Sequence, residues 1–527
     1  MSIGNPQRVL MALAVVVGSW LPSLAQNFDI DYLKYHILST KEKTVEVDCL
    51  VDENIENIVI PSEVYYDGVN YTVAAIGYNA FDFCHNLKSV DIPDSVKSIC
   101  DCAFYNCSAL MSVKIGTSVK SIGRHAFSYC SSLTSINIPN STETIEYGAF
   151  LGCESLEAVT IGKSVISFGE FAFAGNNSLA GITVSKDNPN YDSRGGCNAI
   201  IETATNTLMV GCSATAIPRD VKHIGENAFF NCMSLRSFDI PDWVETIGRG
   251  AFSECQSLES ITIGKSVNSI EENVVDFCHN LTSITVSEDN PNYDSRGGCN
   301  AIIETATNTL VIGCSATVIP QDVKHIGEYA FHGCTSLQSI DIPVSVETIG
   351  GRAFMSCMSL TTIVLGNSIR SIGDRAFCCC AALKSVEIGE SVELIGDAAF
   401  LYCLELKKVY SRATTPPVCP SAEVFDNQNT HLTIYVPIGC LDIYIRTVPW
   451  NDFDIREWNP LDIDGVAADE VAVKVVGGSI IFSSKTDAKV YTSAGMLVAS
   501  GVIGEVEVPA GIYIVRVGDK TAKVIVR

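Results

Sequence analysis

The stretch IGRHAFSYCSSLTSINIPNSTET, residues 122–144, decides the fold because variants of it recur along most of the chain. Its consensus is I-G-x-x-A-F-x-x-C-x-x-L-x-x-V-x-I-P/G-x-S-V-x-x, a unit of 23 residues in which Phe, Leu and Cys keep a common register. The Phe recurs at Phe81, Phe104, Phe127, Phe150, Phe173, Phe229, Phe252, Phe331, Phe354, Phe377 and Phe400, and Val275 takes its place once. Self-similarity at a fixed period of this length is the signature of a solenoid.

The pattern within each unit predicts which residues are buried. In L-x-x-V-x-I the apolar residues alternate with polar ones, as in a short strand with one buried face. The Pro or Gly that follows ends this strand. The A-F-x-x-C segment suits one turn of helix that directs Phe and Cys into the same core. A single unit cannot enclose these residues but stacked units can. We therefore expect one continuous solenoid over residues 70–410, with Phe127, Phe150, Phe354 and Phe377 in one buried spine.

Two units are longer than the rest. The added segments, residues 187–223 and 289–325, are nearly identical and are separated by 102 residues, which indicates a tandem duplication. Each reads D-N-P-N-Y-D-S-R-G-G-C-N-A-I-I-E-T-A-T-N-T-L. This pattern predicts a loop, a β-hairpin that turns at residues 203–206, and a return to the solenoid at Ile217 and Pro218.

The hairpin register makes cysteine pairs within each insert candidates for disulfides. A loop at residues 203–206 makes Glu202 face Thr207, and directly opposed residues on antiparallel strands have Cβ atoms about 4.5–5.5 Å apart. Counting five residues away from the turn on each strand places Cys197 opposite Cys212 in the first insert and Cys299 opposite Cys314 in the second. Cys197–Cys212 and Cys299–Cys314 are therefore two possible bridges. The alternative is buried thiols, since a register shift of one residue sends the side chains to opposite faces.

The N-terminus has the features of a secretory signal peptide at residues 1–25. Arg8 precedes an apolar run over residues 9–21, and Ser23-Leu24-Ala25 offers the small residues of a cleavage site. The run is shorter than the roughly 20 residues that a transmembrane helix needs. We expect no membrane span in the mature chain, and a protein that is secreted or held on a bacterial cell surface.

Charge and motifs argue against several functions. With 35 Lys and Arg against 60 Asp and Glu, the net charge is −25, which disfavours nucleic acid as a partner. Gly162-Lys163-Ser164 resembles the end of a phosphate-binding loop, but Glu157 stands where that motif needs Gly. The eight His are scattered, and the Cys lack paired zinc-ligand spacing. We expect no enzyme activity, no cofactor and no metal.

The repeat unit and the insert motif N-A-I-I-E-T-A-T-N-T-L resemble the BspA-type leucine-rich-repeat family of bacterial surface proteins. The resemblance implies a mainly β fold with short helices, built as a leucine-rich-repeat solenoid over residues 76–410. Residues 26–75 are similar to the N-terminal β cap of such proteins. Residues 411–458, which include W-N-D-F-D-I-R-E, resemble the segment that closes the array.

A separate module is expected after an acidic linker at residues 459–470. Residues 471–527 contain V-Y-T-S-A-G-M-L-V and V-P-A-G-I-Y-I-V-R-V-G, and they are similar to the small β-sandwich sorting domain of type IX secretion. Ser493 and Ala494 stand where that family has Asp-Leu, so a plain C-terminal β-domain is the alternative.

The family resemblance implies an adhesin that binds host matrix proteins or other bacteria through an extracellular protein or glycan ligand. The candidate binding face consists of the polar positions that flank the buried strand residues, such as Lys88, Asp91, Asn137, Glu259 and Thr262. Such positions hold almost no Tyr, Trp or Arg, the usual hot-spot residues, so binding there requires many weak contacts. The alternative is a structural spacer scaffold with no dedicated ligand.

Overall fold

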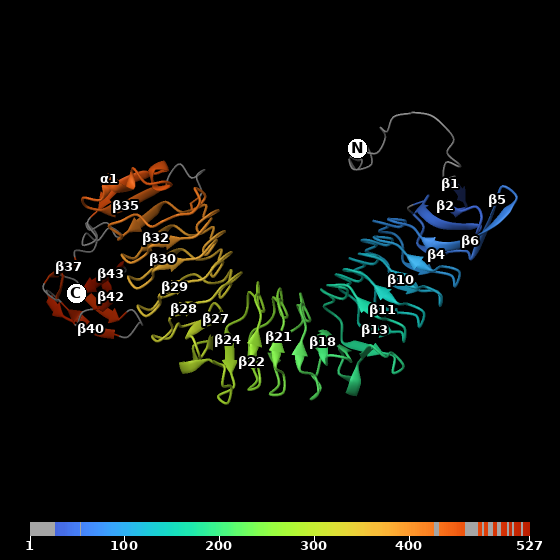
Figure 1. Cartoon of the computed structure of the whole chain (residues 1–527), viewed down its shortest axis with the longest axis horizontal. Helices are drawn as coiled ribbons and strands as arrows, with labels where there is room; N and C mark the ends of the chain where they lie inside the picture. Colours follow the sequence, from blue (N-terminus) through green and yellow to red (C-terminus); the bar gives the residue numbers. More distant parts are fainter. Residues whose placement is uncertain are drawn as a thin grey trace.

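The computed structural model describes residues 27–52, 54–425 and 432–458, together with strands between residues 473 and 526. The stacked units form an open arc, with an N-terminal β cap at one tip and helix α1 (Leu441–Tyr444) near the other (Figure 1). The predicted signal peptide and linker lie outside the described residues.

Each unit crosses the rod twice as a short strand. In residues 98–120, strand β8 (Ser98–Ile99) is followed by a long turn, then by β9 (Ser112–Lys114), and then by a short turn that leads to the next unit. Strands of the β8 type make flank A of the rod, and strands of the β9 type make flank B. Pairing is parallel with a shift of 23 residues: Ser98 pairs with Ser121, and Ser89 with Ser112. On both flanks, each strand residue thus pairs with the residue one sequence repeat further along the chain.

The strands of the first part of the arc are bounded as follows. Flank A and the cap that continues it contain β1 (Asn27–Ile30), β2 (Leu33–Ser39), β3 (Thr44–Leu50), β5 (Glu63–Tyr66), β6 (Val69–Ile76), β8, β10 (Ser121–Ile122), β12 (Thr144–Ile145) and β14 (Ser167–Phe168). Flank B contains β4 (Asn57–Val59), β7 (Ser89–Asp91), β9, β11 (Ser135–Asn137), β13 (Ala158–Ile161) and β15 (Gly181–Val184). We call this part block 1.

Two further blocks follow, one after each insert. Block 2 has β18 (Thr207–Val210), β19 (His223–Ile224), β21 (Thr246–Ile247) and β23 (Ser269–Ile270) on flank A, and β20 (Ser237–Asp239), β22 (Ser260–Ile263) and β24 (Ser283–Val286) on flank B. Block 3 has β27 (Thr309–Gly313), β28 (His325–Ile326), β29 (Thr348–Ile349), β31 (Ser371–Ile372) and β33 (Leu394–Ile395), then β30 (Thr362–Val364), β32 (Ser385–Ile388), β34 (Lys408–Ser411), β35 (Thr433–Pro437) and β36 (Asp454–Trp458). No named sheet continues through a whole insert from one block to the next.

The long turns are not helical, so the expectation of a helical turn at A-F-x-x-C is wrong. Cys102 and Asn106 have φ of 58° and 56°, and such left-handed residues interrupt a right-handed helix in each unit. The backbone groups bond instead to the next unit, where Phe104 N–H donates to Ala126 O. Described helices are limited to α1 and the 3-10 turns η2 (Arg194–Gly196), η3 (Arg296–Gly298) and η4 (Trp450–Asp452).

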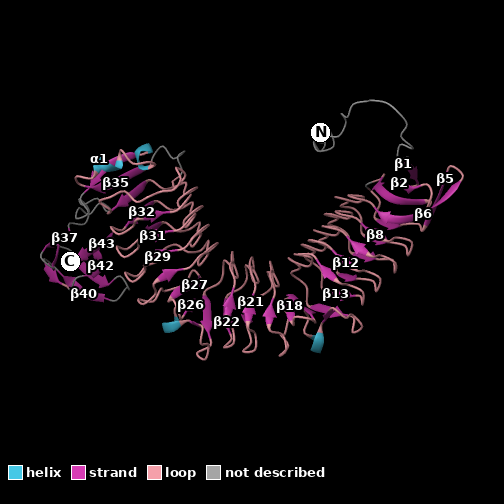
Figure 2. Cartoon of the chain, in the orientation of Figure 1, coloured by secondary structure: helices cyan, strands magenta, loops and turns pink. Residues whose placement is uncertain are grey.

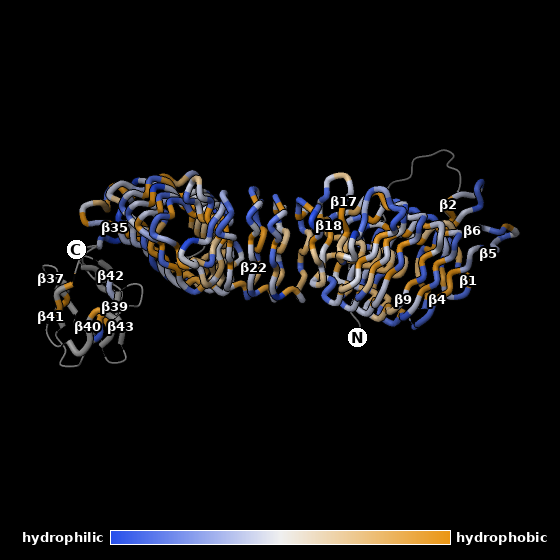
Figure 3. Tube along the Cα trace, turned by 90° about the horizontal axis from the view of Figure 1, so that it is seen from below, coloured by the Kyte–Doolittle hydropathy of each residue, from blue (hydrophilic) through white to orange (hydrophobic). Residues whose placement is uncertain are grey.

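The core is a column of stacked rings inside each block. Phe104 and Phe127 lie nearly parallel with centroids 5.0 Å apart. All four rings named as the spine are fully buried, as predicted. The column is interrupted at both inserts, however, so that three stacks begin at Phe81, Phe229 and Phe331 in place of one spine. Figure 3 shows the matching alternation of hydrophobic and hydrophilic residues along the turns.

Each insert hairpin is a partition between two cores. The first pairs β16 (Tyr191–Asp192), β17 (Ile200–Glu202) and β18, and the second pairs β25 (Tyr293–Asp294), β26 (Ala301–Glu304) and β27. Ile200 packs into the core of block 1, whereas its neighbour Ile201 packs into that of block 2. A strand buried on both faces requires an unbroken apolar run, which explains A-I-I in each copy. The hairpin turn is as predicted, with Glu202 opposite Thr207.

The inserts also account for the bends of the arc. Figure 2 places η2 and η3, and therefore the inserts, on the outer side of the arc. On flank A, β18 is an additional strand that lies between β14 of one unit and β19 of the next, and it is followed by a shortened turn. On the opposite edge the long turns of those units touch directly, as the rings of Phe171 and Phe230 lie 4.7 Å apart. Extra chain on one edge only acts as a wedge, so the long turns line the inner side.

The C-terminal end is closed by aromatic packing. Trp450 and Tyr444 are fully buried: Trp450 contacts Phe425, the last ring of the third stack, and Tyr444 contacts Trp450. The following module has two antiparallel sheets, of β37 (Val473–Val476), β38 (Ser479–Phe482) and β41 (Glu505–Glu507), and of β39 (Ala488–Thr492), β40 (Leu497–Val502), β42 (Gly511–Val517) and β43 (Lys520–Val526). Its packing as a sandwich and its role in sorting stay predictions.

Candidate binding surface

The face predicted from the sequence lies on flank B. Lys88 lies directly before β7, and Asp91 ends that strand. Most of its charges pair with a neighbouring unit: Lys88 Nζ lies 2.8 Å from Glu56 Oε2, and Asp91 Oδ2 lies 3.0 Å from Lys114 Nζ. Asn137 also lies on flank B of block 1, whereas Glu259 and Thr262 belong to flank B of block 2.

Side-by-side pairing limits what flank B offers a ligand. Glu259 Oε1 is 3.0 Å from Arg236 Nη1, and Thr262 Oγ1 accepts a hydrogen bond from Thr285 Oγ1. Exposed pairs of this kind contribute about 0–1 kcal/mol each to stability. Their side chains are half-exposed, and any ligand must compete with the partners already in place.

A second surface, not found from the sequence, runs along the long turns of block 1. Its rings contact one another from unit to unit: Phe83 with Tyr105 at 5.5 Å, Tyr105 with Tyr129 at 5.6 Å, and Tyr147 with Phe171 at 5.6 Å between centroids. His125 joins Tyr105 to Tyr147, and Phe230 extends the row into block 2. We call Phe83, Tyr105, His125, Tyr129, Tyr147, Phe171 and Phe230 the aromatic ledge.

The aromatic ledge lies on the inner side of the arc and is open to solvent in part. Phe83 is 51% exposed and Tyr129 is 43% exposed. Most neighbouring rings meet edge to face, an arrangement that leaves part of each π-face or edge available to a ligand. Large aromatic side chains supply most of the binding energy at protein interfaces. The ledge therefore has the aromatic residues that are rare on flank B of blocks 1 and 2.

Part of the aromatic ledge has a left-handed backbone, a conformation that recurs at the same positions of other units. Phe83, Tyr129 and Phe171 have φ of 57°, 61° and 57°, in the left-handed region where a side chain costs about 1–2 kcal/mol. Equivalent positions in other units are left-handed too and hold varied residues, such as Asn106 and Glu254 at the position of Tyr129 and Arg352 at the position of Phe171. The left-handed conformation therefore belongs to the repeat, and the aromatic side chains are the feature that is specific to these units.

The sequence contained a signal for the ledge that was missed. Its rings lie one or two residues on either side of the buried Ala-Phe pair, at positions that vary between units. If the A-F-x-x-C segment is assumed to be helical, these positions are not expected to lie beside the equivalent positions of the next unit. Counting aromatic residues at the left-handed positions, such as Phe83 and Tyr129, would have found them.

The four insert cysteines are buried and unbonded in the structure, which matches the alternative of buried thiols and not the two possible bridges. A β-bulge between Ile200 and Ile201 shifts the register by one residue, so that Cys212 approaches Asn198. Cys212 Sγ lies 3.4 Å from Asn198 O, while Cys197 faces the opposite core. The second copy is the same: Cys314 Sγ lies 3.4 Å from Asn300 O, and Cys299 is also free.

The cysteines of the repeat are packing residues. Cys130 Sγ donates a hydrogen bond to Phe104 O in the preceding unit, and Cys153 Sγ donates likewise to Phe127 O. Burial raises the pKa of Cys153 to about 12. The nucleophile of thiol chemistry is the thiolate, so these groups are unreactive while the protein is folded.

Among the described residues, no group of three or more His, Cys, Asp or Glu is arranged to hold a metal ion. No helix in the same part of the chain is long and apolar enough to cross a bilayer. The geometry is that of an elongated repeat surface.

Comparison with known proteins identifies the family. The model for the "BspA type leucine rich repeat region (6 copies)" matches residues 74–193, 209–307 and 311–430. This is more than half of the chain, and the chain belongs to the BspA-type leucine-rich-repeat family. No curated protein matches it.

Solved structures of leucine-rich-repeat proteins are similar to it. One from Bacteroides ovatus is 31% identical, with 73% of this chain and 94% of that chain covered and a TM-score of 0.42. A leucine rich cell surface protein from Faecalibacterium prausnitzii is 27% identical, covers 74% and 95%, and has a TM-score of 0.40. The pneumococcal vaccine antigen PcpA is 16% identical, covers 83% and 99%, and has a TM-score of 0.37.

Proposed function

We propose that this protein is displayed on a bacterial cell surface as an adhesin, and that the aromatic ledge is its binding surface. Secretion through the signal peptide of residues 1–25 is part of this proposal. Support comes from the family and from a relative whose name is that of a cell surface protein. The carrying observation is the unbroken row of rings from Phe83 to Phe230 on the inner side of the arc.

The row suits an elongated extracellular ligand, either a host matrix protein or a polymer on another bacterium. Rings repeat along the rod at the spacing of the units, so an extended chain laid along the inner side meets several of them. Contacts that are weak singly then add through multivalency. The ligand is bound without being chemically changed, and neither a cofactor nor a metal takes part.

Binding to immobilised matrix proteins and bacterial glycans tests this proposal. The test variant replaces Phe83, Tyr129 and Phe171 with Asn, the residue found at the equivalent positions Asn106 (for Phe83 and Tyr129) and Asn227 (for Phe171). Each lost ring should weaken binding about tenfold or more, because aromatic hot spots contribute that much. Circular dichroism and thermal unfolding establish that the variant is folded.

A matched control changes flank B instead. Replacing Lys88 and Asn137 with Ala alters the face predicted from the sequence and leaves the aromatic ledge intact. Loss of binding in this control but not in the ring variant would assign the function to flank B. Wild-type protein that binds nothing in a broad panel would favour the alternative of a spacer scaffold.

A further inference from the structure

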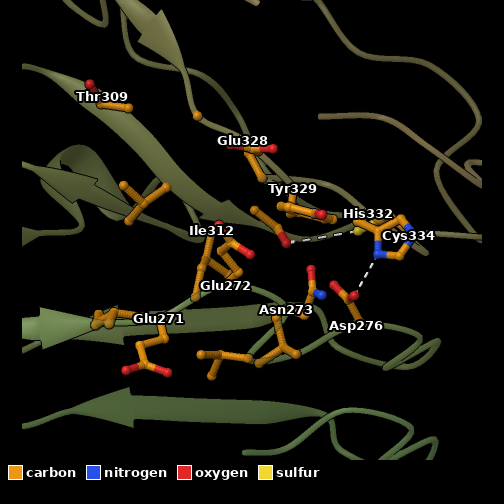
Figure 4. A pocket seen from close by; sticks show the side chains of 17 residues that line it. Glu271, Glu272, Asn273, Asp276, Thr309, Ile312, Glu328, Tyr329, His332 and Cys334 are labelled. Carbon is orange, nitrogen blue, oxygen red and sulfur yellow. Dashed lines mark hydrogen bonds and ion pairs between the residues drawn. The ribbon is translucent and has the colours of Figure 1, made fainter. Parts of the chain in front are cut away.

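The two inserts are near-copies, and a cavity adjoins the second of them. The cavity has a volume of about 210 Å³ and lies between blocks 2 and 3 (Figure 4). The long turn of residues 271–276, β27 and the long turn that includes Tyr329 and His332 line it. Because the duplication is offset by 102 residues, each lining residue has an equivalent at the first insert.

The difference begins at the spine. Val275 occupies the position that Phe fills in every other unit, and its equivalent at the first insert is Phe173. Val275 lines the cavity, whereas Phe173 stacks on Phe150 with centroids 5.3 Å apart. The smaller side chain therefore leaves room where the first insert has a ring.

Polar groups have replaced apolar ones around this space. Asp276 and His332 form a buried pair, with Oδ2 and Nδ1 2.5 Å apart and side chains 8% and 13% exposed. Ala174 and Phe230 stand at these two places in the first copy. Burying polar groups is costly unless each is hydrogen-bonded. Asp276 and His332 meet this requirement for each other, and the second copy thus has polar side chains where the first has apolar ones.

One acceptor in the cavity has no partner. The side-chain oxygen of Asn273 is buried and makes no hydrogen bond. Figure 4 shows Asn273 beside Asp276, with both side chains at the cavity. The equivalent of Asn273 is Phe171. Two residues with oxygen acceptors, Asn273 and Asp276, thus line a cavity that is partly open to solvent.

The remaining lining is acidic at the rim and apolar on the walls. Glu271, Glu272 and Glu328 line the cavity, and His332, already bonded to Asp276, is the sole basic residue among those that do. Arg249 and Arg352 pair with Glu272 and Glu328 from outside the lining. The walls come from Ile270, Val274, Val275, Ile312 and Ala330. An apolar body with a cationic end matches this lining.

We propose that this cavity binds a primary alkylammonium group, as carried by a lysine side chain or a free amine. Its N–H groups donate to Asp276 and to the unpaired oxygen of Asn273, and its methylene stem lies against Val275 and Ile312. An ammonium has three donors and no acceptor, which suits a site that offers acceptors. The site is separate from the aromatic ledge and does not depend on the adhesin proposal.

Calorimetric titration of the full-length protein with n-butylamine at neutral pH tests the site, with n-butanol as the uncharged comparison. Butylammonium should bind at least about tenfold more tightly than butanol, because charge-assisted hydrogen bonds add to the burial of the stem. Equal affinity would reduce the site to an apolar cavity and overturn the assignment. Absence of saturable butylammonium binding to folded protein would overturn it as well.

Variants that restore first-copy residues provide controls that the fold already accommodates. Val275→Phe should fill the cavity and abolish binding, and Asp276→Ala should remove the preference for the charged ligand. Phe173→Val, made at the first insert, should leave butylammonium affinity unchanged. Binding retained in Val275→Phe would place the ligand elsewhere and refute the proposal. Titration with Nα-acetyl-lysine amide distinguishes the two sources of the ammonium group. If this compound binds as tightly as butylammonium, the site accepts a lysine side chain of a protein; if it does not bind, the site accepts a free amine.

Discussion

The aromatic residues at left-handed positions combine a backbone cost with side-chain contacts. Tyr129 has φ of 61°, and its ring contacts Tyr105. We expect Tyr129→Asn to change the free energy of unfolding by less than about 1 kcal/mol, since strain relief of about 1 kcal/mol offsets a ring contact of similar size. Urea denaturation of the purified protein measures this.

Tyr129→Ala is the control for that argument. Ala loses the same ring but, unlike Asn, gains little from the left-handed conformation. The Asn variant should therefore be more stable than the Ala variant by about 1 kcal/mol, while both lose affinity for the ligand of the aromatic ledge. If Asn and Ala were equally stable, backbone strain would not be what distinguishes this position.

The buried carboxyl group of Asp276 predicts a particular pH dependence. Burial raises the pKa of Asp276 above its usual value, and the hydrogen bond with His332 offsets part of this rise. A raised pKa in the folded state means that folding favours the protonated form. The contribution of Asp276 to stability is therefore full below its unfolded pKa and is lost as pH rises through its folded pKa.

Comparison with Asp276→Asn isolates this effect, because Asn cannot titrate. The stability of the wild type relative to the variant should fall as pH rises from about 3.9, the unfolded pKa of Asp, and level off above the folded pKa. Unfolding of both proteins in urea across this range provides the measurement. A difference that rises with pH would mean that the His332 bond outweighs burial.

At the scale of elements, the spacing of residues in the sequence predicted those features that depend on residues close together in the chain. The 23-residue register of both flanks and the turn that sets Glu202 opposite Thr207 follow from periodicity and turn chemistry. The bulge at Ile200 does not, because the apolar pattern of the insert does not mark where an extra residue enters one strand of the pair. The one-residue shift that it introduces takes the cysteines out of the register that the two possible disulfides require.

The long turns failed as a prediction for a related reason. A-F-x-x-C has helical spacing, but its backbone groups bond to the next unit, as Phe104 N–H does to Ala126 O. Stacking between units therefore determines the conformation, and helical propensity is overridden. The aromatic ledge depends on the same stacking, since its rings are neighbours only after the units have been placed side by side.

At the scale of the molecule, the inserts divide a uniform repeat into three blocks and bend it. The cores on either side of the first hairpin share no ring stack, because the wedge separates Phe173 from Phe229. The inner side stays continuous, since Met233 N–H donates to Asn177 Oδ1 across the junction. The arc thus keeps one lined inner surface while its cores are separate.

Removing the wedge should straighten the rod. Deletion of residues 185–217 joins Val184 to Pro218 and restores the 23-residue period, because Phe229 then follows Phe173 by one unit. The two rings are free to stack, as Phe150 and Phe173 do at 5.3 Å, which stabilises the new junction. The same operation on the second insert removes residues 287–319 and joins Val286 to Pro320.

Small-angle X-ray scattering measures the consequence as the maximum dimension of the particle. The arc is open, so straightening it separates its tips (Figure 1). We expect each deletion to lengthen the maximum dimension although the chain loses 33 residues, and the double deletion to lengthen it most. Folding is checked by a cooperative thermal transition. A folded double deletion that stays as strongly curved as the wild type would show that curvature resides in every unit, and the inserts would then serve as partitions between cores without shaping the arc.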